Sequence, residues 1–406
     1  MINSIRSRRK QIFFSTTSSN DDTIPKKGRL YGGLNVPKAT VWCLAVTIVA
    51  YWGVTNNMKD VKVTNMANID PISLSSSSSS NSVPCSSSIK EVVSSDDETC
   101  KSLPLIRPTC TKYDDFDKGI EKGSSPEGIN PTFSVGSYYA DKVVYHMKAD
   151  RDNFVLIKEY LDNKNKGLAL DFGANQGFYT YYLATLGLDV HAFEIDDKNF
   201  KSLQHGVRYN PKDVSDRVNL YRVGIGDVNG RFAMRGNNYE GFLVPNKEGP
   251  IAGARVDCFV DHIKEHSDLT STKIDFIKID VEGFEIAVLQ GGRNSLFRQQ
   301  QKIGSMIMEV GPNRWNRASV SFEVGVEEMT RLASFFTTSY LLTRSPGSGF
   351  YKTCPVSLGE EILKDKEPRT VGSIRVFKIQ GAEEWGKLLT YMKDKNFDCN
   401  FFYENK

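Results

Sequence analysis

The 406-residue chain lacks several of the patterns by which whole classes of protein are known. Its seven cysteines are scattered and none forms a C-x-x-C pair, which argues against a zinc cluster. The net charge is only +3 and no basic stripe interleaved with aromatic residues occurs, which argues against a nucleic-acid substrate. The one candidate glycosylation sequon, Asn130-Pro-Thr132, contains the excluded proline, so the sequence offers no site for an N-linked sugar.

Long apolar runs are scarce too. Residues 39–54 form one, with sixteen residues and no charge, whereas a membrane-spanning helix usually needs about 20 residues. Lys38 can extend the run by reaching toward the headgroups. A cleaved signal peptide and a buried core helix are the alternatives, but a long basic tail precedes the run and a serine-rich stretch follows it. We predict an N-terminal signal-anchor over residues 39–55, with the basic tail 1–38 in the cytoplasm, as the positive-inside rule requires.

After this run the composition becomes serine-rich, with consecutive serines from Ser75 to Ser80. Such a stretch cannot bury enough apolar surface to offset its ordering entropy. We therefore predict a disordered stem over residues 56–135 and a folded domain over residues 136–406. Because a short span suits the thin membranes of the early secretory pathway, we expect a single-pass protein of the endoplasmic reticulum or Golgi with this domain in the lumen.

What the chain does have is a glycine-rich turn, Asp171-Phe-Gly-Ala-Asn-Gln-Gly177, directly after the apolar run 167–170. This order predicts a buried strand, a tight turn and a helix N-terminus, where backbone N–H groups can approach a ligand closely. A carboxylate at the end of the strand would repel a pyrophosphate, so the pattern suits a ligand with a cationic, amino-acid-like group such as S-adenosylmethionine. Asp171, Gly173, Asn175 and Gly177 are therefore candidate cofactor-binding residues.

Two further acids follow the next strand-like segments. Glu194 ends the run Leu188–Phe193, and an acid at the tip of the second strand of a doubly wound sheet can accept both ribose hydroxyls of a nucleoside. An acid beside a helix N-cap is the alternative explanation. Asp227 follows the third strand, where it can face an adenine amino group or be an ordinary turn aspartate. We predict both acids as cofactor-binding residues.

The third motif, IDFIKIDVEGFE at residues 274–285, is a buried strand that leads into a helix. It places Lys278, Asp280 and Glu282 near the end of the strand, and the following strand ends on Glu309. We predict these four residues as catalytic. For Lys278, pairing with Asp280 on the same face of the strand is the structural alternative.

Four of these segments, in this order, carry a resemblance to a known family: DFGANQG, FEID, IDFIKIDVEGFEIAVLQGG and MIMEVGP. Over about residues 136 to 345 the chain resembles the FkbM family of S-adenosylmethionine-dependent methyltransferases. The resemblance implies an O-methyltransferase that acts on hydroxyls of sugars or polyketides. It also implies S-adenosylmethionine as cofactor and requires no metal.

Strand-like and helical segments alternate along the body of the chain. This predicts an α/β fold with a doubly wound, mostly parallel sheet of the Rossmann-like class I methyltransferase type. The expected strands are 168–172, 190–193, 218–223, 274–279, 306–309 and 337–343, with a last strand over 396–403 at an antiparallel edge. The expected helices are 153–161 and 322–336, and the segment 344–395 has no clear assignment. Ligands bind at the carboxyl ends of such strands, so the acids at these ends should converge.

Methyl transfer to an oxygen needs the acceptor oxygen, the methyl carbon and the sulfur to lie in line, and an alcohol acceptor must lose its proton to a base. Asp280 or Glu282 would be that base. The alternative is a divalent metal held by Asp280, Glu282 and Glu309, although we predict no metal. The favoured function is a membrane-anchored O-methyltransferase of a glycan hydroxyl. Methylation of a lipid or small molecule, and a non-catalytic module that binds a nucleoside or glycan, are the alternatives.

Overall fold

A computed structural model describes residues 119–162, 167–236, 241–260, 273–298, 303–346, 348, 353–364 and 366–405, all within the unit Ser82–Lys406. The predicted basic tail, the signal-anchor and most of the predicted stem lie outside these residues. Among the helices that the structure describes, none has the length and apolar character needed to cross a membrane.

The described elements alternate between strands and helices. The strands are β1 (Glu121–Ser124), β2 (Ser134–Ser137), β3 (Leu168–Phe172), β4 (Asp189–Phe193), β5 (Val218–Tyr221), β6 (Val223–Gly226), β7 (Gly230–Arg235), β8 (Phe242–Pro245), β9 (Ile251–Arg255), β10 (Ile274–Ile279), β11 (Ile303–Val310), β12 (Thr338–Arg344), β13 (Arg369–Val371), β14 (Ile374–Ile379) and β15 (Cys399–Glu404). The helices are α2 (Ala140–Leu161), α3 (Phe178–Thr185), α4 (Asp197–Tyr209), α5 (Lys212–Ser215), α7 (Glu285–Gly291), the 3₁₀ helix η3 (Pro312–Ala318), α8 (Phe322–Ala333), α9 (Val356–Ile362) and α10 (Gly381–Lys395).

A nine-stranded sheet in the order β13-β14-β12-β15-β11-β10-β3-β4-β5 forms the centre of the fold. The five strands from β11 to β5 pair in parallel, and β15, β12, β14 and β13 extend the sheet through antiparallel pairings. The chain builds β3, β4 and β5 outward and then returns to place β10 on the other side of β3. The strand order therefore switches between β3 and β10, and ligands of such sheets bind outside the carboxyl ends of the strands at this point.

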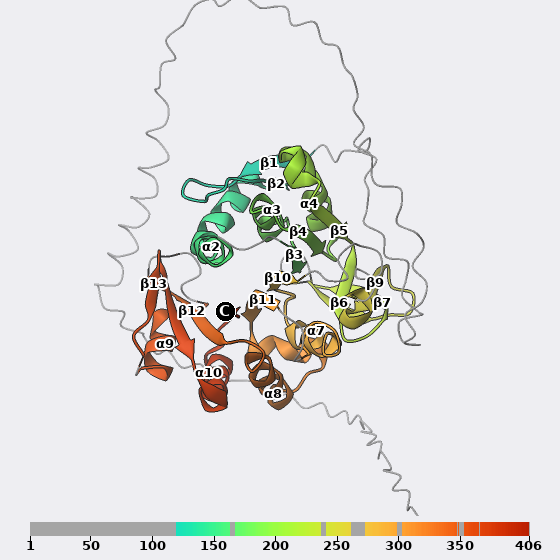
Figure 1. The fold of residues 1–406 in the computed structure, drawn as a ribbon. Helices are drawn as coiled ribbons and strands as arrows, with labels where there is room; N and C mark the ends of the chain where they lie inside the picture. The colour runs from blue at the N-terminus through green and yellow to red at the C-terminus, as the bar shows by residue number, and fades with distance from the viewer. Residues whose placement is uncertain are drawn as a thin grey trace, which may run out of the picture. The chain divides into compact units, whose positions relative to one another are not determined.

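The central strands are apolar along most of their length because both faces of the sheet are covered. Every residue of β3 and β10 is buried, as expected of parallel strands between two helical layers. One face packs against α2, α3 and α4 through residues such as Phe154 and Tyr181. The other face packs against α7, α8, α9 and α10 through residues such as Val288 and Leu389 (Figure 1).

A second sheet of four strands, in the order β6-β9-β7-β8, follows directly after β5. Its small apolar cluster of Phe232, Leu243 and Ile251 also contacts Ile195 and Phe284, which follow β4 and β10. The small sheet therefore packs against the carboxyl ends of the central strands, on the side where the strand order predicts a ligand.

The structure confirms a mixed α/β fold with a large central sheet and corrects several details of the prediction. Segment 218–223 is not one strand but parts of β5 and β6, which belong to different sheets. The last strand, β15, is not at an edge but lies between β11 and β12, and the edges are β13 and β5. The sheet is parallel in its β11-to-β5 half and antiparallel in the remainder. The unassigned segment 344–395 supplies α9, β13, β14 and α10.

The predicted start of the domain at residue 136 is too late. Strands β1 and β2 pair with one another, although β1 and the first half of β2 lie within the range predicted as a disordered stem. β2 also packs tightly on α4, because a Cβ at Gly136 would lie 2.5 Å from the carbonyl oxygen of Ser202. This hairpin thus belongs to the folded domain. Residues 140–161 then form the single helix α2, of which the sequence predicts only the second part.

Candidate active site

The glycine turn after β3 packs directly against the turn after β10. Gly173 has a φ of +82°, and a Cβ there would lie 1.8 Å from the carbonyl oxygen of Asp280. Gly177 has a φ of +94° and begins α3, where a Cβ would strike the side chains of Leu203 and Tyr181. The left-handed backbone and the close contacts therefore require glycine at both positions.

Asp171 is fully buried at the end of β3 and lines neither of the two cavities described below. It accepts a hydrogen bond from Thr180 Oγ1 at 2.6 Å and lies 3.6 Å from Lys278 Nζ. Burial raises the pKa of Asp171, and the charge of Lys278 opposes that rise. The predicted direct contact of Asp171 with a cofactor is therefore revised: Asp171 holds Lys278 and the first turn of α3 in place.

Lys278 joins the two turns at the switch in strand order. Its ammonium group donates to the carbonyl oxygen of Gly173 at 2.5 Å and lies 3.4 Å from the carboxylate of Asp280, the predicted partner. Burial lowers the pKa of this amine, but the carboxylates of Asp280 and Asp171 outweigh that effect and raise it above its ordinary value. Lys278 therefore stays protonated, and its ammonium group links the two turns rather than acting as a base.

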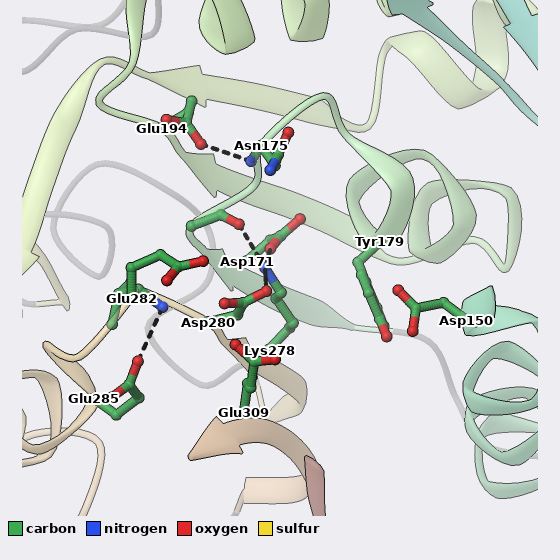
Figure 2. Close-up of polar contacts among 12 residues, drawn as sticks. Asp150, Asp171, Asn175, Tyr179, Glu194, Lys278, Asp280, Glu282, Glu285 and Glu309 are labelled. Carbon is green, nitrogen blue, oxygen red and sulfur yellow. Dashed lines mark hydrogen bonds and ion pairs between the residues drawn. The ribbon is translucent and has the colours of Figure 1, made fainter. Parts of the chain in front are cut away.

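Glu194 closes the glycine turn from the end of β4. Its carboxylate accepts a backbone hydrogen bond from Asn175 at 2.7 Å (Figure 2). It accepts two more from the backbone of Ile195 and Asp196, at 2.8 and 2.7 Å. Burial raises the pKa of Glu194 to about 7, against the effect of these hydrogen bonds. A carboxylate has about four acceptor positions, so one is left for a ligand. Beside it, the buried Oδ1 of Asn175 has no partner.

The turn after β10 has an unusual backbone. Glu282 has a φ of +55° and Gly283 one of +102°, and a Cβ at Gly283 would lie 2.5 Å from the carbonyl oxygen of Arg314. A non-glycine residue in this region costs on the order of 1 kcal/mol and is found mainly where a site needs the side chain in a fixed direction. Here the turn directs Glu282 toward Arg314 (Figure 2 shows Glu282 and the neighbouring acids).

Arg314, in η3, connects carboxylates that come from three different elements. Its guanidinium contacts Glu282 and lies 3.2 Å from Glu309 and 3.0 Å from Asp398. Burial and the neighbouring Asp280 raise the pKa of Glu282 to about 7, although Arg314 lowers it. The same causes hold the pKa of Glu309 well above its usual value.

The three acids predicted as an alternative metal site do come together. Carboxylate oxygens of Asp280, Glu282 and Glu309 lie within 4.8 Å of one another. Arg314, however, already pairs with two of the three, so a divalent cation would have to displace a guanidinium that is also bound to Asp398. The geometry therefore favours an arginine-centred acid cluster over a metal centre.

Two cavities meet beside this cluster. The first, of about 90 Å³, lies between the carboxyl ends of the central strands and the small sheet. Its polar lining residues are Asn175, Glu194, Asp196, Asn199, Asp280 and Glu282. Its apolar side chains are Phe193, Ile195, Val223, Ile225, Met234, Phe242, Leu243, Val281 and Phe284. An apolar slot beside a carboxylate suits a nucleoside, whose base packs against the apolar wall while the ribose hydroxyls donate to the acid.

The second cavity, of about 310 Å³, shares Asn175, Asp280 and Glu282 with the first. Charged and polar side chains dominate its lining, among them His146, Asp150, Tyr179, Lys278, Glu309, Arg314, Arg344, Asp398 and Asn400. Figure 2 shows Asp280 near the centre, with Glu282 to one side and Tyr179 and Asp150 to the other. A group bound in the first cavity can therefore reach a molecule bound in the second.

The structure places the predicted site residues in different roles. The four predicted catalytic residues all line the second cavity: Lys278, Asp280, Glu282 and Glu309. Of the six predicted cofactor residues, Gly173, Asn175 and Glu194 line the first cavity. Asp227, by contrast, is exposed in the turn after β6 and lines neither cavity. Gly177 lines neither cavity and serves the packing of α3 instead.

Sequence reasoning missed the residues that complete the second cavity. Arg314 follows Glu309 by five residues and could have been noticed as a cation next to the strand end. Asp150, Arg344 and Asp398 come from α2, β12 and the residue before β15, far apart in the sequence. No local sequence pattern predicts them, because only the fold brings them together.

Comparison with known proteins identifies the domain. The family model of the methyltransferase FkbM domain matches residues 171–337, a range that contains every residue lining the first cavity. No curated protein matches the chain.

Distant similarities to solved structures accompany this match. An S-adenosylmethionine-dependent methyltransferase from Neisseria gonorrhoeae is 18% identical, with 41% of this chain and 62% of that chain covered and a TM-score of 0.24. A human methyltransferase 10 domain containing protein is 13% identical, with coverages of 64% and 83% and a TM-score of 0.29. A glycopeptide N-methyltransferase in complex with S-adenosylmethionine is 14% identical, with coverages of 40% and 54% and a TM-score of 0.22. This chain spans less than two thirds of the length of the first and the third of these proteins.

The first cavity fits the cofactor that the family uses. S-adenosylmethionine supplies an activated methyl group on a sulfonium. Glu194 has an acceptor position for its ribose, the apolar slot suits its adenine, and the unpartnered Oδ1 of Asn175 can accept from one of its donors. Residues 171–337 of this chain are a methyltransferase domain of the FkbM family, and S-adenosylmethionine is its cofactor.

Proposed function

We propose that the protein is an O-methyltransferase that methylates a hydroxyl of a glycan. The observation that carries this proposal is the second cavity, which opens onto the cofactor cavity and is lined mainly by hydrogen-bonding side chains. Carboxylates and amides of this kind match the donors and acceptors of a sugar.

The transfer breaks the bond between sulfur and the methyl carbon, forms a bond from that carbon to the acceptor oxygen, and releases the hydroxyl proton. Asp280 is the proposed acceptor of this proton, because it lines both cavities and is held by the ion pair with Lys278. Glu282 lines both cavities too, but Arg314 and Arg317 engage its carboxylate. Lys278 fixes the distance between the two turns, and the in-line arrangement depends on that distance.

We further propose that the domain works in the lumen of the endoplasmic reticulum or Golgi, attached by the predicted anchor. A disulfide between Cys354 and Cys399 supports an oxidising compartment, since such bonds are rare in cytosolic proteins. The sequence does not predict this bond. Glycans are assembled in the same compartments, which links the proposed location to the proposed acceptor.

The experiment that tests the function is transfer of a tritiated methyl group from S-adenosylmethionine into total glycan and lipid extracts, with the full-length chain. We expect label in the glycan fraction and none in a reaction with the Asp280→Asn variant. Label confined to the lipid fraction would show that the acceptor is a lipid and not a glycan. Binding of S-adenosylmethionine without transfer to any fraction would show a non-catalytic module.

A further inference from the structure

The two cavities differ in which parts of the chain build them. All residues that line the cofactor cavity lie within the family domain, residues 171–337. The acceptor cavity takes one wall from outside that range: His146 and Asp150 from α2, Leu342 and Arg344 from β12, Thr353 and Cys354, and Asp398 and Asn400 around the start of β15. We call these eight residues the outer wall. A part of the site supplied by flanking segments is the part in which this chain can differ from other members of its family.

Asp150 is the best-held acid of the outer wall. It lies 3.1 Å from Arg344 Nη2 and accepts a hydrogen bond from Asn153 Nδ2 at 3.1 Å. Arg344 also donates to the carbonyl oxygen of Ala149 at 2.5 Å, which fixes the guanidinium against α2. The side chain of Asp150 is 22% exposed and that of Arg344 5%. Because Asp150 lines the cavity, this exposed surface faces the acceptor space rather than the outside of the domain.

Acidic residues outnumber basic ones in the lining of the whole cavity. Five carboxylates line it, namely Asp150, Asp280, Glu282, Glu309 and Asp398, against the three cations Lys278, Arg314 and Arg344. Each cation is already paired: Lys278 with Asp280, Arg314 with Glu282, Glu309 and Asp398, and Arg344 with Asp150. Burial lowers the pKa of His146 and raises the pKa of Asp150 and of Glu309, so the imidazole adds little charge and not all five acids are ionised at neutral pH.

We propose that the outer wall, with Asp150 as its specificity-determining residue, selects a neutral polyhydroxylated sugar and rejects an acidic one. This inference rests on the proposed glycan methylation and names the acceptor class for that same site. A carboxylate or phosphate on the acceptor would lose its hydration and gain no counter-ion, because each cation of the lining stays bound to its own partner. Sugar hydroxyls can donate to and accept from the same carboxyl groups. Rejection of an uncompensated anion and recognition by hydrogen bonding thus come from one set of residues.

The test compares matched pairs of methyl hexopyranosides and methyl hexuronides that differ only at C6, in the gluco, galacto and manno series. Each sugar is tested with the full-length chain, first as a methyl acceptor and then as a competitor of methyl transfer into the glycan extract. We expect the neutral member to be preferred in each series. Asp150→Asn should raise KM for the neutral sugar and shrink the preference by about tenfold, the scale of one unit charge at short range. Asn400→Asp adds a carboxylate of the same shape and should widen the preference.

The two variants should shift the preference for the neutral sugar in opposite directions. Structural damage would shift this preference in the same direction in both variants, so the two explanations can be told apart. The affinity for S-adenosylmethionine, measured by calorimetry, should stay unchanged in both. Asp141→Asn, an exposed acid on the same helix, is the matched control and should change neither quantity. Equal use of neutral and acidic sugars, or shifts in the same direction, would overturn the inference while glycan methylation stands. Transfer to no saccharide at all would overturn the proposed function and this inference together.

Discussion

Asp280 is one of the three residues that line both cavities, and Asp280→Asn tests its proposed role as base. The amide keeps the shape of the side chain but cannot take up a proton. We expect turnover to fall by ~10²–10⁴-fold, the usual effect of a lost general base, and the deficit to shrink as pH rises. Cofactor affinity should be nearly unchanged, because the assigned ribose acceptor is Glu194. Steady-state kinetics and calorimetry measure the two quantities.

The matched control is Asp213→Asn, an exposed acid in α5, which should leave both quantities as they are. If Asp280→Asn and Glu282→Gln lose cofactor affinity in parallel with rate, these acids are binding groups and the role of base is wrong. An activity that collapses with a chelator and returns with a divalent cation would show that the acids hold a metal in place of Arg314.

Glu285 provides a test of stability against pH, since it lies outside both cavities. One oxygen accepts from the Gly283 amide at 2.9 Å and the other is buried without a partner. Burial raises its pKa from 4.5 to about 7. Between these values the folded protein binds more protons than the unfolded chain, so the contribution of Glu285 to stability falls as pH rises through the window. The fall is about 3 kcal/mol from the size of the shift.

Glu285→Gln removes this titration. We expect the free energy of unfolding of the wild type to decrease, relative to that of the variant, by about 3 kcal/mol between roughly pH 4 and pH 8. Urea unfolding at a series of pH values measures both. Curves that stay parallel across the window would show that burial does not raise the pKa of Glu285.

At the scale of elements, what the sequence predicted and what it missed have physical reasons. β3, β4, β10 and β11 were predictable because strands covered on both faces are nearly continuous apolar runs. The turns after β3 and β10 were predictable because their glycines and acids stand next to those runs. β13 and β14 were missed, since a short antiparallel hairpin has no such run. The ion pairs of Arg314 and Asp150 were missed because their partners lie far away in the sequence.

The disulfide between Cys354 and Cys399 ties the segment before α9 to the start of β15. Thr353, Asp398 and Asn400, its immediate neighbours, line the acceptor cavity but not the cofactor cavity. Replacing both cysteines with alanine should lower the free energy of unfolding by about 2–4 kcal/mol, as is typical for such a cross-link. It should also raise KM for the acceptor and leave the affinity for S-adenosylmethionine unchanged.

Chemical unfolding, acceptor kinetics and calorimetry of the double variant measure these three effects. Treatment of the wild type with a reductant is a second way to remove the same disulfide. A loss of cofactor affinity equal to the loss of acceptor affinity would mean that the bond supports the whole domain rather than the acceptor wall.

At the scale of the whole molecule, the proposed topology places residues 1–38 in the cytoplasm and the folded domain in the lumen. A C-terminal tag should then be protected from protease in intact microsomes and become sensitive after detergent. An N-terminal tag should be digested in both conditions and is the internal control. Digestion of the C-terminal tag without detergent would place the domain in the cytosol and remove the argument from location to glycans.

The organisation of the chain divides its tasks. The family domain supplies the cofactor cavity, and the segments on either side of that domain supply the outer wall of the acceptor cavity. Both the proposed reaction and the proposed acceptor selection require a cofactor bound in the first cavity.

The most direct test is calorimetric titration of S-adenosylmethionine into the full-length protein, its Glu194→Ala variant and the control Glu327→Ala, an exposed acid on α8. We expect the wild type and the control to bind alike. Glu194→Ala should lose roughly 1.5–3 kcal/mol of binding free energy, the scale of hydrogen bonds to a charged group. Equal affinity in all three proteins would contradict the assignment of the cofactor to this cavity.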